Sequence, residues 1–144
     1  MATDERYGQQ PAKPRNDFDG ATVDKSGFAY RDLIGEDKWE SFTPSVSLTV
    51  VGTPTYTGRY RKVGRSCYFQ VSLVSSTSIA TTAGTSYVDL PVTAKGIGGV
   101  ATMSNSTTNI SVGTCHISVS ASRCYLPTQS ASANTFTVNG HFEI

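Results

Sequence analysis

Charged residues are scarce in this sequence, and their scarcity narrows the classes of protein that it can encode. Asp, Glu, Lys and Arg make up 16% of the 144 residues, against roughly 25% in an average soluble domain. Residues 41–144 contain two acids and six bases, a net charge of +4, whereas Ser and Thr occupy 34 of these 104 positions. Thr is favoured in strands, where Lys and Glu are depleted, so this composition favours a β-rich domain with a hydroxyl-covered surface. A net charge of this size does not by itself predict a polyanion partner.

Cysteines and long apolar runs are also few. Cys67, Cys115 and Cys124 form no CxxC pair and leave one odd thiol. This count argues against a secreted disulfide scaffold and favours free thiols made in a reducing cytoplasm. The opening residues MATDERYGQQ have no apolar core, so we expect no secretory signal peptide. No run approaches the ~18 apolar residues of a membrane span, so we expect no membrane insertion.

Groups suited to catalysis, metal binding or cofactor binding are equally sparse. Asp89 and Glu143 fall in different predicted strands, which does not suggest a paired-carboxylate site. The remaining candidates for a zinc site do not have the spacing of known zinc ligands. Two of them are also neighbours on a strand, and such neighbours point to opposite faces. The candidates are Cys115, His116, Cys124 and His141. We therefore expect a protein that is not an enzyme and holds no metal or cofactor.

The chain changes character near residue 38. Residues 1–38 are rich in Pro, Gly, Asp and Lys and poor in aliphatic side chains, so they cannot bury enough surface to fold alone. Large apolar residues are nevertheless spaced through them, which predicts an extended arm that docks on a folded partner. The predicted anchoring residues are Tyr7, Phe18, Phe28 and Tyr30. A disordered tail is the alternative interpretation.

From Ser45 onward, apolar residues recur with period 2, which is typical of strands with one buried face. Two runs show this most clearly, with inward positions at Cys67, Phe69, Val71 and Leu73, and at Phe136, Val138, Phe142 and Ile144. Similar runs lie at residues 45–51, 85–92, 99–103, 109–122 and 123–128. The pattern predicts an all-β domain over residues 39–144. We expect about eight strands in two packed antiparallel sheets, a β-sandwich or jelly roll.

The stretch from Tyr56 to Arg65 combines basic and aromatic residues. On a single strand, Arg59, Arg61 and Arg65 would form a ridge on one face, with Tyr56 and Tyr60 on the other. This separation weakens a combined stacking and phosphate site of the kind that single-strand nucleic-acid binders use. We therefore expect no nucleic-acid partner, and keep a small single-strand binder as the least favoured alternative. The arginines are expected to face solvent, a neighbouring subunit or the acidic arm.

Several short motifs resemble a module found in virion proteins of tailed bacteriophages. They are Trp39-Glu-Ser-Phe-Thr-Pro44, Gly52-Thr-Pro-Thr-Tyr-Thr-Gly-Arg-Tyr60 with Arg61-Lys-Val-Gly64, Tyr68-Phe-Gln-Val71, Tyr87-Val-Asp-Leu-Pro-Val-Thr-Ala94 and Gly140-His-Phe-Glu-Ile144. The resemblance covers residues 39–144. It implies a small jelly-roll or sandwich domain of tail fibres, tail spikes, head fibres or capsid decoration proteins. Such modules often form trimers, and an N-terminal segment fastens them to the particle.

The expectation that follows is a non-enzymatic virion structural protein, made in the host cytoplasm. Residues 1–38 would attach it to capsid or tail proteins, and residues 39–144 would be displayed, with three copies as the expected oligomer. The chain has no coiled coil or collagen-like shaft, which favours a decoration protein or short head fibre over a long tail fibre. The alternative is a receptor-binding tail-fibre tip or an adhesin that binds a host-surface glycan. Its sugar-stacking rings would come from Tyr56, Tyr60, Tyr68, Tyr87 and Tyr125.

Overall fold

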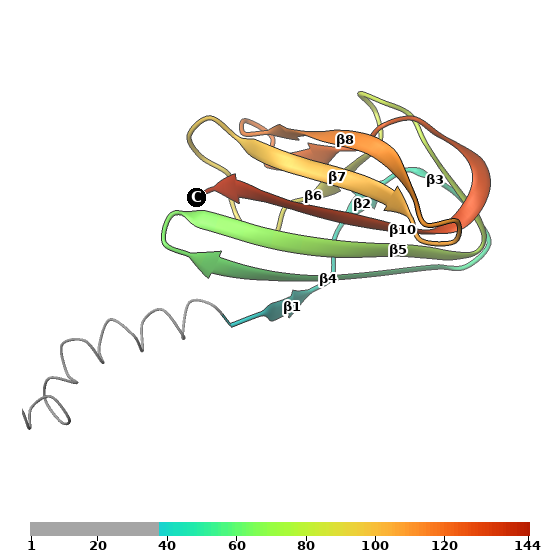
Figure 1. Ribbon diagram of the computed structural model, residues 1–144, viewed down its shortest axis with the longest axis horizontal. Coiled ribbons are helices and arrows are strands. Elements are labelled where there is room, and N and C mark those ends of the chain that lie inside the picture. The colour runs from blue at the N-terminus through green and yellow to red at the C-terminus, as the bar shows by residue number, and fades with distance from the viewer. Residues whose placement is uncertain (1–37) are drawn as a thin grey trace, which may run out of the picture. The chain divides into compact units, whose positions relative to one another are not determined.

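Ten strands form the part of the chain that the computed structural model describes, residues 38–144 (Figure 1). The strands are β1 (Glu40–Phe42), β2 (Val46–Ser47), β3 (Thr49–Val51), β4 (Pro54–Val63), β5 (Ser66–Thr81), β6 (Tyr87–Asp89), β7 (Gly99–Asn105), β8 (Ile110–Ser118), β9 (Arg123–Tyr125) and β10 (Gln129–Glu143). Residues Trp39–Ile144 form one unit. The predicted anchoring residues Tyr7, Phe18, Phe28 and Tyr30 lie outside the described residues.

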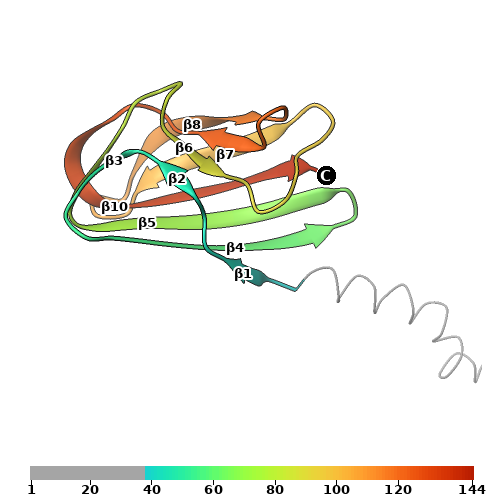
Figure 2. The ribbon, with the colours of Figure 1, turned by 180° about the vertical axis from the view of Figure 1, so that it is seen from behind.

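All the strand pairs are antiparallel and belong to one sheet, in the order β1-β4-β5-β10-β7-β8-β9-β6-β2, with β3 paired to β5. The predicted all-β antiparallel class is therefore confirmed. The predicted division into two separate sheets differs from the structure, because β8 pairs with β9 and so joins the two layers through hydrogen bonds. Figures 1 and 2 show β2 and β6 on the opposite side of the domain from β5 and β10.

The sheet curls into a half-barrel because its far ends are tied together along the chain. Strand β2 is the last strand of the sheet, yet only Leu48 separates it from β3, which pairs with β5. The run 45–51 was predicted as one strand, but the structure divides it between these two partners. Register shifts between Gln129 and Thr135 in β10, and after Met103 in β7, mark bulges. Bulges bend strands and raise their twist, which helps the sheet to curve.

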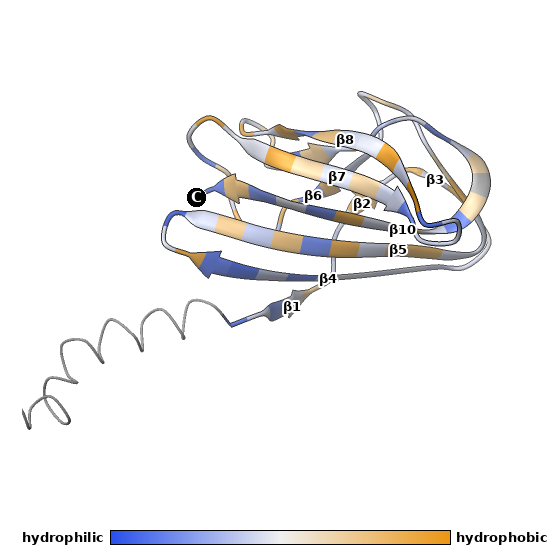
Figure 3. Ribbon diagram, in the orientation of Figure 1, coloured by the Kyte–Doolittle hydropathy of each residue, from blue (hydrophilic) through white to orange (hydrophobic). Residues whose placement is uncertain are grey.

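The core fills the inside of the curl, and strand alternation supplies it. Hydrophobic and hydrophilic positions alternate along β5 and β10 (Figure 3). The largest fully buried side chains are Phe69, Phe136, Phe142, Leu73, Ile79, Met103, Leu126, Val71, Val88, Val138, Cys67 and Cys124. The inward faces predicted for these two strands are thus confirmed, with Ile144 packed at the edge of the core. Burial of this kind contributes about 25 cal/mol per Å² of apolar surface, and it fixes which residues face outward.

Candidate functional site

The face of the sheet opposite the core, here called the outer face, carries a continuous row of side chains. Strand register places one residue from each strand side by side across seven consecutive strands, from β4 to β6. In order, the row contains Arg61, Tyr68, His141, Val100, His116, Tyr125 and Tyr87. We call these seven residues the ring row, because five of them carry rings. Cross-strand neighbours stand about 4.5–5.5 Å apart at their Cβ atoms, so their side chains contact one another.

Ring contacts run along much of this row. The rings of Tyr68 and His141 lie 5.5 Å apart at their centroids, with an angle of 32° between their planes. Tyr125 lies 5.7 Å from Tyr87 in an edge-to-face arrangement and 6.4 Å from His116. Val100 stands between the two histidines and is 59% exposed. Exposed rings held by a rigid sheet form a flat surface on which another ring or a sugar can stack.

Two arginines and a tryptophan extend the β4 end of the row. The guanidinium carbon of Arg59 lies 4.8 Å from the centroid of Trp39, and that of Arg61 lies 5.2 Å from it. Arg61 also lies 5.4 Å from the Tyr68 ring. These distances are within the range of cation–π attraction. We call Trp39, Arg59, Arg61, Tyr68 and His141 the cationic end of the ring row.

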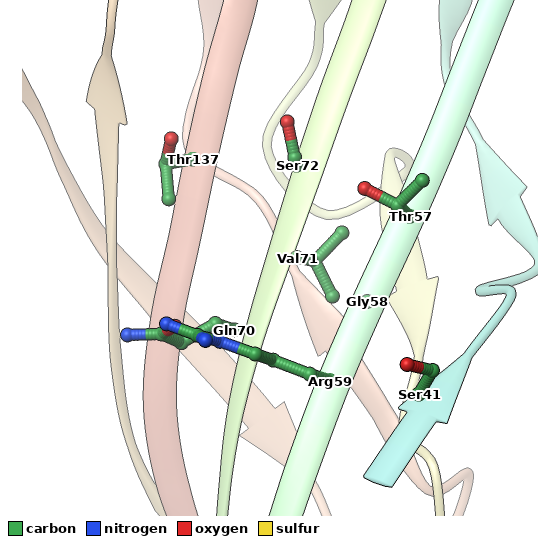
Figure 4. A pocket seen from close by; sticks show the side chains of 8 residues that line it. All are labelled: Ser41, Thr57, Gly58, Arg59, Gln70, Val71, Ser72 and Thr137. Atoms are coloured by element: carbon green, nitrogen blue, oxygen red, sulfur yellow. The ribbon is translucent and has the colours of Figure 1, made fainter. Parts of the chain in front are cut away.

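A shallow groove lined by hydroxyl groups adjoins the cationic end (Figure 4). Its volume is about 320 Å³, and its lining is Ser41, Thr57, Gly58, Arg59, Gln70, Val71, Ser72 and Thr137. The Arg59 side chain reaches from β4 toward β5, where its Nε donates a 2.7 Å hydrogen bond to Gln70 Oε1 (Figure 4). A second groove of about 420 Å³ shares Gln70 and runs over Trp39 and Tyr68 to His141. The two grooves thus form one surface with hydroxyls on one side and rings on the other.

The sequence prediction for the Tyr56–Arg65 stretch holds for β4 but not for its end. Tyr56 and Tyr60 are half-buried and pack against the core, whereas Arg59 lies on the outer face with Arg61. Arg65 does not join them, because β4 ends at Val63 and Arg65 lies in the turn before β5. Its guanidinium instead forms a 2.6 Å ion pair with Glu143. The predicted three-arginine ridge is therefore a pair.

Burial governs the ionisation of the inward tyrosines. The pKa of Tyr56 is raised by burial, and burial also raises the pKa of Tyr60. The charge of Glu40 and its hydrogen bond with the Tyr60 hydroxyl raise that pKa further. The Glu40 carboxylate is thereby directed to Tyr60, a partner on the inward side of β4. It is not part of the grooves on the outer face.

The residues considered for catalysis or zinc binding do not form one site, although the thiols of Cys115 and Cys124 are hydrogen-bonded to each other in the core. Asp89 forms an ion pair with Arg123 at 3.0 Å, and Glu143 binds Arg65. Among the candidates for a zinc site, both cysteines point into the core and both histidines are exposed on the outer face. Residues 38–144 contain no group of three His, Cys, Asp or Glu side chains placed to hold a metal ion. No helix in this range has the length and hydropathy that a membrane span requires.

Sequence reasoning named Arg59, Arg61 and Tyr68 as candidates but did not bring them together with Trp39 and His141, because it treated each strand separately. Within β4 the basic and aromatic residues do lie on opposite faces. The rings that meet the arginines come from other segments, namely Trp39 before β1 and Tyr68 on β5, and the Tyr68 ring in turn contacts His141 on β10. Strand parity could have placed Tyr68 and His141 outward, but no local signal gives the register that puts them side by side.

The chain was compared with protein-family models, with curated proteins and with solved structures, and none of the three comparisons finds a match.

Proposed function

We propose that this chain is a non-enzymatic structural protein of a tailed-bacteriophage virion. Residues 1–38 attach it to the capsid or tail, and residues 39–144 are displayed on the particle as a decoration or short head-fibre-like domain. The proposal rests on the resemblance to virion modules described above. One observation carries it further: four of the five motifs behind that resemblance lie on adjacent strands.

Four of the motifs are contiguous in the sheet, and the last of them is far from the others in sequence, whereas Tyr87–Ala94 contains β6, between β9 and β2. Trp39–Pro44 contains β1, which pairs with β4 inside Gly58–Gly64. Tyr68–Val71 of β5 lies between β4 and β10, where Gly140 and His141 pair with Phe69 and Tyr68. Motifs that pack together in this way are expected of a real structural module rather than of chance matches.

The fold suits a displayed domain. Strand β5 pairs without interruption with β4 from Pro54 to Val63 and with β10 from Thr135 to Glu143, and the surface is covered with hydroxyl groups rather than charges. The half-barrel would then be a form of the jelly-roll or sandwich module in which the two layers stay joined through β8 and β9. Three copies around a common axis are the proposed assembly, following the resemblance.

Deleting residues 1–38 tests the attachment. The truncated protein is expected to remain folded by far-UV circular dichroism but to be missing from virions when it replaces the full chain during phage assembly. A full-length variant with serine at the four predicted anchoring residues, Tyr7, Phe18, Phe28 and Tyr30, should show the same loss. A full-length Lys95→Gln variant, changed at an exposed loop residue, is the control. Wild-type levels of the truncated protein or of the serine variant on particles would contradict the proposal.

A second function, binding of a host-surface glycan as a tail-fibre tip or adhesin, is favoured by the outer face. Rings such as Tyr68 stand exposed beside a groove of hydroxyl and amide groups. Of the tyrosines considered as sugar-stacking rings, the structure places Tyr68, Tyr87 and Tyr125 on the outer face, and Tyr56 and Tyr60 against the core. A glycan array probed with the full chain tests this function. No binding at high protein concentration would contradict it.

A further inference from the structure

We propose that the cationic end of the ring row, with the hydroxyl-lined groove beside it, is a binding site for an oligosaccharide that carries carboxylate groups. The sugar rings would stack on Trp39 and Tyr68, and a carboxylate would bind the guanidinium of Arg59. This inference rests on the second proposed function, glycan recognition, and is independent of attachment to a virion.

The charge of the site indicates an anionic ligand. Arg59 is exposed, and its Nε is held by the neutral side chain of Gln70 rather than by a carboxylate. Within the described residues, the carboxylates are directed elsewhere: Glu40 to Tyr60, Asp89 to Arg123 and Glu143 to Arg65. The two terminal amino groups of a guanidinium match the two oxygens of a carboxylate, and such bidentate pairs are among the stronger hydrogen bonds in proteins.

The opposite end of the ring row shows why this end is favoured. Tyr87 and Tyr125 contact each other there edge to face, and the guanidinium of Arg123 lies 3.9 Å from the Tyr87 ring centroid. However, Arg123 Nε is bound by the Asp89 carboxylate at 3.0 Å, so its charge is already compensated. A ligand carboxylate placed there would meet Asp89, whereas at Arg59 it would meet an amide and hydroxyls.

Arg59 is also held in place before any ligand arrives. Its guanidinium is fixed between the hydrogen bond to Gln70 and the face of Trp39. A side chain that is already ordered loses less conformational entropy when it binds, and this favours affinity. Arg61 contributes in a different way, because it lies against both rings and so keeps Trp39 and Tyr68 in a common arrangement.

The lining of the groove favours a sugar over a nucleic acid. Hydroxyl groups line the groove on four neighbouring strands (Figure 4). Those of Thr57, Ser72 and Thr137 belong to residues paired across three strands, and Ser41 pairs with Arg59. Hydroxyl groups can donate and accept, which suits the many hydroxyls of a sugar chain. A phosphate-tracking groove instead uses a series of lysines and arginines, and its affinity depends steeply on salt. The groove that holds these hydroxyls contributes one such cation, Arg59.

The test uses three carboxylated oligosaccharides: tetragalacturonate, 3′-sialyllactose and a hyaluronan tetrasaccharide. Each is paired with its carboxyl methyl ester, which keeps the sugar rings and removes the charge. Calorimetric titration of the full chain is expected to show binding of at least one acid, about tenfold or more tighter than its ester. Arg59→Gln should remove most of that preference, and Tyr68→Ala should weaken the acid and its ester together. Lys95→Gln, which deletes the same charge from an exposed loop residue that lines neither groove, should leave both unchanged.

Each alternative result overturns a defined part of the proposal. An ester that binds as tightly as its acid leaves glycan recognition standing and refutes the carboxylate site. Equal losses in the Arg59→Gln and Lys95→Gln variants would show a general charge effect instead of a site. Tighter binding of a single-stranded thymidine oligonucleotide than of any acid would assign the surface to nucleic acid. If no acid or ester binds at millimolar concentration, both the site and the glycan function are refuted.

Discussion

Gly140 lies at the centre of the sheet, and a methyl group there should destabilise the domain. In β10 it pairs with Phe69 of β5 on one side and Ala101 of β7 on the other. A Cβ atom added at this position would lie 2.5 Å from the Ala101 Cβ and 2.6 Å from the Val100 carbonyl oxygen. Favourable carbon–carbon contacts need about 3.5–4.0 Å, and a backbone carbonyl cannot move aside by a change of rotamer.

Whether Gly140→Ala lowers or raises the free energy of unfolding shows whether the site is as crowded as described. Glycine in a strand is less stable than alanine by roughly 0.5–1 kcal/mol because of its backbone entropy, so Gly140→Ala in an open strand would be stabilising. Overpacking a well-filled site costs about 1–3 kcal/mol, and contact with the backbone places this site at the upper end. We therefore expect a net loss of about 2 kcal/mol in the free energy of unfolding.

Urea unfolding followed by far-UV circular dichroism measures this loss. The matched control is the double variant Gly140→Ala with Ala101→Gly, which removes the contact with the Ala101 Cβ and should be more stable than the sum of the two single losses predicts. If Gly140→Ala is as stable as the wild type, or more stable, then β10 does not pack against β7 as described. If the losses of the two single variants simply add in the double variant, Ala101 is not the neighbour in question.

Three further predictions concern the core and its edge. All three cysteines are buried, namely Cys67, Cys115 and Cys124. A thiol reagent should therefore modify none of them in the native protein and three per chain in urea. Fast reaction of the native protein would contradict this. Burial raises the pKa of Cys67 from 9.0 to about 11, so the unfolded state loses this proton first and the free energy of unfolding should fall between pH 9 and 11. Urea titrations should show a smaller fall for Cys67→Val, and an equal fall would refute the assignment. Arg65→Gln breaks an ion pair whose arginine is 83% exposed. Thermal unfolding should therefore show that the free energy of unfolding falls by less than about 1 kcal/mol, and that the difference shrinks with added salt. A larger fall would contradict this.

Alternation made the core predictable from the sequence. Cys67, Phe69, Val71 and Leu73 fall on one face because side chains alternate along a strand, and all four are buried. The same rule placed His116 outward beside the inward Cys115. These inferences need nothing beyond the chain around each residue, so they could be made without knowing which strands pair.

The sheet order and the outer face could not be predicted in the same way. The closure of the curl depends on Leu48 alone separating β2 from β3, and nothing in the run 45–51 shows that its halves have different partners. The ring row depends on the register of seven strands at once, and a shift of one residue in any of them would break it. Arg65 was misplaced for a related reason, because the strand ends two residues before it.

Nuclear magnetic resonance titration with an acidic oligosaccharide tests the central claim, that the outer face at the β4 end of the ring row is the binding surface. With the tightest-binding acid from the calorimetric test, we expect the largest shifts at the Trp39 indole, the Arg59 Nε–H, and the side chains of Tyr68 and His141. Signals of Tyr87 and of the exposed Ile97 should stay in place. Shifts centred on the loops or on the Tyr87 end, with the Trp39 and Arg59 signals unchanged, would contradict the account.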